Sequence, residues 1–217
     1  MQDEKVSNDG DASRKWRADD PRRVRMAEKR MAILRAARPI LLRDGLGGTT
    51  LDRVAAEGGI AKMTLYRHFP NKEALFQGLV TAMCEHMREQ LENAPLANAD
   101  QPAAQRLTAE LHAFTSALIE PDAVALYRLI VADGWRFPDI SRVFEQSGMY
   151  VIRQRIARVL ETGGVPVVQA TKVATEVVAL ALGDAYQRAV LGIVEKTDHQ
   201  AFAQQIEAAV AHGFSDH

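Results

Sequence analysis

The stretch that decides the fold is TTLDRVAAEGGIAKMTLYRHF, residues 49–69. It predicts two short helices, near 50–57 and 61–69, that meet at Gly58-Gly59. Glycine suits such a turn because one of its residues usually needs a positive φ. Four apolar residues lie where a helix-turn-helix buries its inner faces: Val54, Ala55, Ile60 and Leu65.

The second of these helices has an outer face suited to DNA. At 100° per residue, its exposed side chains span an arc of about 140°, while Leu65 and Phe69 turn toward the core. Charged ends on this arc can reach phosphates or guanine edges, and apolar side chains can contact thymine methyls. The residues of the outer face are Lys62, Met63, Tyr66 and Arg67.

The charge of the chain is unevenly distributed. Its 27 basic and 28 acidic side chains give a net charge of −1. Residues 1–80 hold 16 basic and 11 acidic groups, a net +5, and residues 81–217 hold 11 and 17, a net −6. Residues 14–80 alone carry +8. This asymmetry suggests that the N-terminal part meets an anion such as nucleic acid or a membrane surface.

The rest of the chain predicts an all-α protein, because helical apolar spacing recurs and no alternating strand pattern is present. Pro39 is expected to kink the first helix or delay its start. Another helix is expected to open at 70–73. The remaining helices are expected near residues 27–43, 102–119, 122–133, 139–161, 168–192 and 199–213.

Three parts are expected along the chain: a flexible basic tail at 1–25, a DNA-binding domain at 26–88, and a ligand-binding and dimerisation domain at 89–217. The tail is polar and without periodicity. It is either a solvated terminus or an arm that lies along DNA phosphates or in a minor groove.

Other function classes lack their signatures. Cys84 is the only cysteine and is expected to be a buried small hydrophobe. The start of the chain has no apolar signal run, and no segment approaches about 18 uninterrupted apolar residues. We therefore expect a cytoplasmic protein with no membrane partner. No catalytic or metal-ligand spacing is evident, so no metal, no cofactor and no enzyme activity are expected.

The run from Thr64 to Phe76, TLYRHFPNKEALF, together with Thr50 and the turn, resembles the DNA-binding domain of the TetR/AcrR transcriptional regulators. This resemblance covers roughly residues 27–88. Residues 126–140, LYRLIVADGWRFPDI, are more weakly similar to a segment of an AcrR-like C-terminal subgroup. The resemblance implies a three-helix DNA-binding domain joined to a helical bundle that dimerises.

The resemblance also implies roles for single residues. Thr50 would cap its helix and touch phosphate, and Arg53 would contact the backbone or a base edge. Lys62 and Met63 lie where family members read bases. The residues implied to grip the phosphate backbone, or able to reach it from the outer face, are Thr64, Tyr66, Arg67, His68 and Lys72.

Two residues depart from the family pattern. Ala61 stands where Ser or Thr commonly caps the recognition helix, which is expected to cost on the order of 1 kcal/mol. Gly58 stands where Ala is usual, which is expected to loosen the preceding helix end by about the same amount.

The C-terminal part offers candidates for a dimer interface and a ligand pocket. Residues 168–192 and 199–213 would form the four-helix interface of similar family members, unless their small-residue stripe packs within its own subunit. The candidate interface residues are Ala174, Val178, Ala181, Ala185, Phe202 and Ile206. The candidate pocket residues, for which core packing is the alternative, are Phe114, Tyr127, Trp135, Phe137, Tyr150 and Tyr186.

These observations predict a homodimeric regulator that binds a palindromic double-stranded operator, most simply a repressor released by a small-molecule effector. The effector would shift the population toward a state with altered head separation. The alternatives are a helical carrier or enzyme that retains a helix-turn-helix head, a protein-interaction adaptor, and a transcriptional activator of the same fold.

Overall fold

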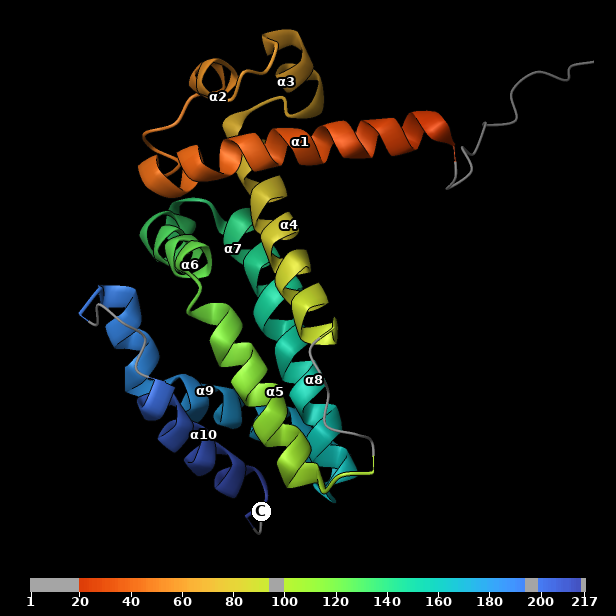
Figure 1. The fold of residues 1–217 in the computed structure, drawn as a ribbon, viewed down its shortest axis with the longest axis vertical. Helices are drawn as coiled ribbons and strands as arrows, with labels where there is room; N and C mark the ends of the chain where they lie inside the picture. Colours follow the sequence, from red (N-terminus) through yellow and green to blue (C-terminus); the bar gives the residue numbers. More distant parts are fainter. Residues whose placement is uncertain (1–19, 94–99, 194–198, 216–217) are drawn as a thin grey trace, which may run out of the picture.

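The computed structural model describes residues 20–93, 100–193 and 199–215. These residues form helices and no strands, so the all-α prediction is confirmed (Figure 1). The elements are α1 Pro21–Asp44, α2 Leu51–Glu57, α3 Lys62–His68, α4 Lys72–Asn93, α5 Ala103–Leu118, α6 Pro121–Asp133, η1 Gly134–Arg136, α7 Pro138–Phe144, η2 Glu145–Met149, α8 Tyr150–Thr162, α9 Val167–Leu191 and α10 His199–Gly213.

The first helix is longer than the sequence predicts. It begins at Pro21 rather than Ala27, so the last five residues of the expected tail are helical. The reason is local: the Asp20 carboxylate accepts a hydrogen bond from the Arg22 amide (2.8 Å), and Pro21 suits the first helical position. The expected late start at Pro39 is wrong, because α1 continues through it. Residues 1–19 of the expected tail lie outside the described residues.

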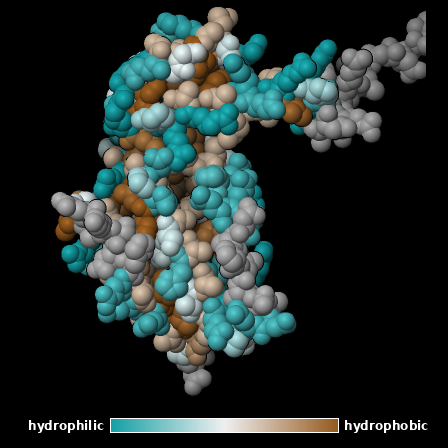
Figure 2. Space-filling model, viewed as in Figure 1, coloured by the Kyte–Doolittle hydropathy of each residue, from teal (hydrophilic) through white to brown (hydrophobic). Residues whose placement is uncertain are grey.

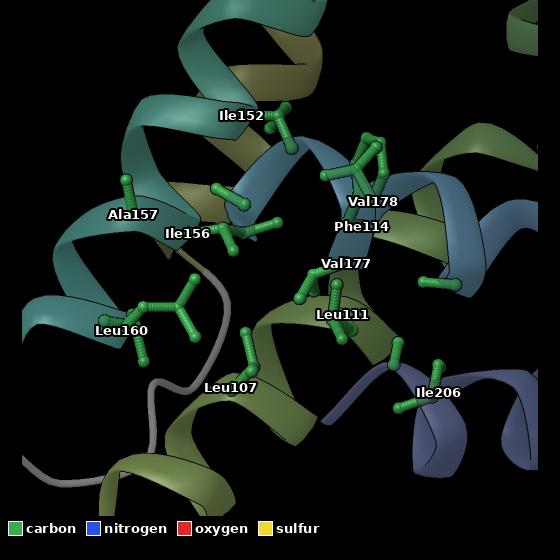
Figure 3. Packing of buried hydrophobic residues seen from close by; sticks show 14 of the residues in the cluster. Leu107, Leu111, Phe114, Ile152, Ile156, Ala157, Leu160, Val177, Val178 and Ile206 are labelled. Atoms are coloured by element: carbon green, nitrogen blue, oxygen red, sulfur yellow. The ribbon is translucent and has the colours of Figure 1, made fainter. Parts of the chain in front are cut away.

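Two hydrophobic cores organise the described residues. One lies in the head, by which we mean α1 to α3 with the first half of α4, and includes Leu34, Leu65 and Phe76. The other lies in the bundle of α5 to α10. Figure 3 shows bundle side chains that point toward one another from α5, α8, α9 and α10, among them Leu107, Leu111, Phe114, Ile156, Leu160, Val177 and Ile206.

Helix α4 belongs to both cores. Leu75, Leu79 and Cys84 pack in the head core, and Leu91 packs in the bundle core. Cys84 is buried as expected, and burial, with the nearby Glu85 charge, raises the pKa of its thiol to about 12. The head core also includes Leu126, Leu129 and Ile140 of α6 and α7. The head and the bundle therefore pack directly against each other and are not joined by a linker alone.

The helix expected at 139–161 is three elements. A π-helical turn at Glu145–Met149 separates α7 from α8. A Cβ at Gly148 in this turn would lie 3.3 Å from the Cys84 Sγ atom of α4. Glycine thus allows the turn to lie close against α4, which apolar periodicity alone does not indicate.

The helix expected at 168–192 is interrupted at Gly183, which has φ 40° and ψ −145°. The Gln205 side chain of α10 bonds to the backbone exposed at this break. With its amide oriented to match its neighbours, it donates to the Leu182 carbonyl (2.9 Å) and accepts from the Asp184 and Ala185 amides (3.0 and 3.2 Å). These bonds satisfy backbone groups that the kink would otherwise leave unpaired.

The predicted dimer residues are not on the surface. All six are less than 9% exposed and pack in the core of their own bundle: Ala174, Val178, Ala181, Ala185, Phe202 and Ile206. Their assignment to a dimer interface is wrong. Small side chains allow close helix packing, and the pattern does not reveal whether the neighbouring helix comes from the same chain. Here α8 and α10 cover this side of α9.

We predict that Gly183→Ala destabilises the protein. The substitution forces a Cβ into a positive-φ conformation, and that atom would lie 2.5 Å from the side-chain amide of Gln205. Thermal or denaturant unfolding should show a loss of about 1–3 kcal/mol. Gly47→Ala, where an added Cβ meets nothing within 4 Å, is the control and should change stability by less than about 0.5 kcal/mol. Equal unfolding midpoints for the two variants would contradict the proposed role of the kink.

Candidate nucleic-acid interface and ligand cavity

The head contains the predicted helix-turn-helix. Thr50 caps α2 by accepting a hydrogen bond from the Arg53 amide (3.2 Å), and Gly59 in the turn has φ 61°. Both features agree with the sequence. Ala61 makes no side-chain cap at α3, as expected. A Cβ at Gly58 would lie 2.7 Å from the Val54 carbonyl oxygen and 3.2 Å from Ala36 of α1, so glycine here allows the turn to pack closely.

The outer face of α3 projects into solvent. The side chains of Met63, Tyr66 and Arg67 are exposed, Met63 by 83%. Lys62 is also exposed and pairs with Asp52 of α2 at 3.1 Å. The Tyr66 hydroxyl donates to the same carboxylate at 3.4 Å. Asp52 therefore holds two side chains of this face, a contact that the sequence pattern does not indicate.

Arg53 faces its own domain. Its guanidinium bonds to Glu57 (2.5 Å), to Asp44 (2.9 Å) and to the Gly48 carbonyl (3.2 Å). The hydrogen bond from Arg53 lowers the pKa of the Glu57 carboxyl, and the hydrogen bond from Arg43 lowers that of Asp44. These charges are neutralised by one another, so Arg53 ties α2 to the end of α1.

Lys72 and His68, two expected phosphate contacts, also serve the fold of the head. The Lys72 ammonium donates to the Leu46 carbonyl at 3.0 Å. The His68 Nε2 atom is buried without a hydrogen-bond partner among the described residues. Burial lowers the pKa of this imidazole, and the charges of Arg67, Arg30 and Lys29 lower it further. Neither group is presented on the outer face as Lys62 is. Thr64, another expected contact, is half-buried on α3.

A cavity of about 1070 Å³ lies between the head and the bundle. It is lined by α1, α4, α6, the end of α5, the turn around η2 and the kinked part of α9. Lining residues include Met31, Leu34, Arg38, Leu79, Met83, Met87, Leu118, Asp122, Leu126, Tyr127, Phe144, Met149, Leu182, Gly183 and Tyr186. Its volume is at the upper end of those of small-molecule sites.

Of the six aromatic residues predicted to line a pocket, only Tyr127 and Tyr186 line this cavity. Phe114 is in the bundle core, and Phe137 packs against the head core. Trp135 and Tyr150 are exposed by 77% and 53%. Aromatic composition alone does not indicate whether a side chain faces the core, the cavity or solvent. The apolar lining also comes from methionine and leucine residues of α1 and α4, which an argument based on aromatic residues does not include.

Two polar groups at the cavity lack full hydrogen bonding. The Tyr186 hydroxyl is buried without a partner among the described residues, and its ring lies 5.3 Å from that of Tyr127, centroid to centroid. Burial raises the pKa of this hydroxyl, with a smaller effect from Tyr127, so it stays protonated and can donate. Arg38 of α1 pairs with Asp122 of α6 across the head–bundle boundary, and its Nε is buried and unpaired.

Two other types of site are absent from the described ranges. No helix there combines the length and apolarity that a bilayer crossing requires. No cluster of three or more His, Cys, Asp or Glu side chains suited to a metal ion occurs in the same part of the chain.

Comparisons with known proteins match both parts. Residues 33–79 match the family model "Bacterial regulatory proteins, tetR family", and residues 105–213 match "AefR-like transcriptional repressor, C-terminal domain". The chain is 33% identical over 67 residues to the uncharacterised HTH-type transcriptional regulator YhgD of Bacillus subtilis. That match spans 31% of this chain and only 35% of YhgD.

Solved structures match over most of the chain. The flavonoid-responsive regulator FrrA is 30% identical with a TM-score of 0.69, over 86% of this chain and 95% of FrrA. A TetR-family regulator from Mesorhizobium loti has the same fold at 20% identity, with a TM-score of 0.72 over 87% and 96% of the two chains. The second family model spans half of the chain, and the coverage of FrrA is almost complete. The protein therefore belongs to the TetR family of DNA-binding transcriptional regulators, which are not enzymes.

Proposed function

We propose that the protein is a homodimeric, cytoplasmic repressor whose operator binding is released by a small molecule held in the cavity between head and bundle. The observation that carries the proposal is the position of this cavity. Its walls include Met31 and Leu34 of α1 in the head and Tyr127 and Tyr186 in the bundle. A ligand there would contact both parts, so its affinity would depend on how they are placed.

The exposed face of α3 is suited to the major groove. Lys62 can reach a guanine edge, Met63 and Tyr66 can contact thymine methyls, and Arg67 can reach phosphate. We assign no such role to Arg53, Lys72 or His68, because their polar groups are used or buried within the head. Thr50 can still offer its exposed N-cap position to a phosphate.

The outward faces of α9 and α10 suit a dimer interface. Val168, Thr175 and Ala179 are exposed on α9, as are Gln204, Ala208 and Ala211 on α10. Four of these six are apolar, Val168 and the three alanines, and such side chains on two adjacent helices allow the close approach of a two-fold related pair. Two-fold symmetry would place the heads for successive major grooves, roughly 34–36 Å apart.

The effector that fits best is a neutral, mostly apolar compound with a hydrogen-bond acceptor. The protonated Tyr186 hydroxyl supplies a buried donor without a partner. The cavity lining holds two arginines, Arg35 and Arg38, against five carboxylates, and this net negative charge disfavours an anionic ligand. The carboxylates are Glu85, Glu89, Glu120, Asp122 and Glu145. The printed name of FrrA, a flavonoid-responsive regulator at 30% identity, supports an aromatic effector for this chain.

A bound ligand would release the operator through the contacts that join the head to the bundle. Arg38 pairs with Asp122, and the Leu46 amide donates to the Asp133 carboxylate at 3.2 Å. Both bonds link the head to α6. A ligand beside Arg38 would favour a different placement of α1 and α4, and by linkage operator DNA would weaken ligand binding by the same factor.

The test combines operator selection with ligand titration. The full-length protein first selects its operator from a pool of random duplexes. Fluorescence anisotropy then measures the affinity of the protein for this operator with and without flavone. We expect flavone to weaken operator binding. Tyr186→Phe should leave DNA affinity unchanged but require about 3- to 10-fold more flavone, the loss of one neutral hydrogen bond. If neither flavone nor other neutral aromatic compounds alter operator affinity, the ligand part of the proposal is wrong.

We predict that Asp52→Asn increases non-specific DNA binding. The change removes a negative charge beside the outer face of α3 and leaves Lys62 without its ion-pair partner. The slope of log Kd against log salt on a random-sequence duplex should rise by up to about 0.9 per protomer. Asp139→Asn, which breaks an exposed pair with Arg142 on α7, is the control. The same change in both variants would argue against a local effect.

We predict that Val168→Glu weakens the dimer. Val168 is 90% exposed on α9, and a dimer interface there would bury the introduced charge. Analytical ultracentrifugation should show a dissociation constant raised at least tenfold, with a parallel loss of operator affinity. Val131→Glu on α6, at a valine exposed by 61%, is the matched control and should remain dimeric. Dissociation of the control instead would place the interface elsewhere.

A further inference from the structure

The N-terminal three turns of α1 project from the body of the protein. Figures 1 and 2 show this end of the helix extending sideways, beyond α4. Every residue from Pro21 to Met31 is exposed, whereas Ile33, Leu34, Ala37 and Leu41 further along the helix are buried. The core of the head does not require this extension, which therefore adds surface without adding packing.

The basic side chains of this extension, Pro21 to Met31, lie mainly on one side of the helix. At 100° per residue, Arg22, Arg25 and Lys29 share one stripe of α1. Met31, Arg35 and Arg38, which line the cavity toward the bundle, lie on the opposite side of the helix. The acidic residue Glu28 lies outside the basic stripe. Arg25 and Lys29 form no ion pair with any described residue.

This basic stripe leads to the C-terminal end of α3. Arg30, which follows Lys29 and lies about 100° further around the helix, donates to the His68 carbonyl (3.3 Å) and stacks on the Phe69 ring at 4.2 Å. Burial lowers the pKa of His68, and the charges of Arg67, Arg30 and Lys29 lower it further. Arg67 lies on the outer face of α3, so basic side chains continue from the recognition helix onto α1.

We propose that the basic stripe Arg22, Arg25 and Lys29 binds backbone phosphates of the DNA that flanks the operator core. The proposal rests on the DNA-binding function and extends its footprint. An α-helix with side chains is about 10–12 Å wide, and the minor groove only about 6 Å, so the extension lies along the backbone. Phosphate contacts carry no direct sequence information, so the flanks contribute affinity without base preference.

The experiment compares two duplexes and uses the full-length dimer. One duplex ends at the selected operator core, and the other carries about eight extra base pairs of arbitrary sequence on each side. Anisotropy titrations over a salt series measure Kd for the parent protein and for the double variant Arg25→Ala/Lys29→Ala. We expect the parent to bind the extended duplex at least fivefold more tightly.

The double variant should lose this gain from the flanks while its affinity for the core duplex changes less than twofold. Its salt slope on the extended duplex should fall by about 2 to 4, because four cations of the dimer no longer displace counterions. Arg35→Ala removes a charge from the opposite side of α1 and should retain the gain.

Three results would overturn the proposal. They are a parent protein indifferent to the flanks, a double variant that weakens both duplexes equally, and an Arg35→Ala variant that loses the gain as well. Failure of the parent to select any duplex would instead contradict operator binding itself, so the two failures are distinguishable.

Discussion

The packing of one helix in two hydrophobic cores is the constraint on which the rest of this structure depends. The first half of α4 completes the head core, and Leu91 near its end is part of the bundle core. Because close-packed interiors transmit displacement rather than absorb it, the helix cannot shift in one core without disturbing the other. The cavity lies along the same helix, so in the proposed function α4 would carry the effect of a bound ligand to the head.

The charges of the head are divided between two tasks. Arg43, Arg53, Asp44 and Glu57 neutralise one another and hold α1 and α2 together. Other cations are exposed and make no ion pair with a described residue, and under the proposals above these would contact phosphate: Arg67 on α3, and Arg25 and Lys29 on the projecting turns of α1. The net charge of the N-terminal part therefore overstates its DNA-binding surface, because charge counts do not distinguish paired from unpaired groups.

Sequence reasoning succeeded where the determinant is local. The Thr50 cap, the glycine turn and the exposed face of α3 depend on residues a few positions apart, and all three are present. It was wrong where the determinant is a neighbour distant in the chain. The small-residue stripe of α9 packs within its own subunit, and four of the six candidate aromatic residues do not line the cavity.

The sequence by itself determined the all-α class, the helix-turn-helix and the family, because helical periodicity, caps and a specific motif are encoded in short segments. Only the tertiary structure decided which face of each helix is covered and by what. Periodicity defines an apolar face but not its partner, and the cavity exists because helices distant in sequence leave space between them. The kink at Gly183 has the same origin, because its backbone bonds come from Gln205 on another helix.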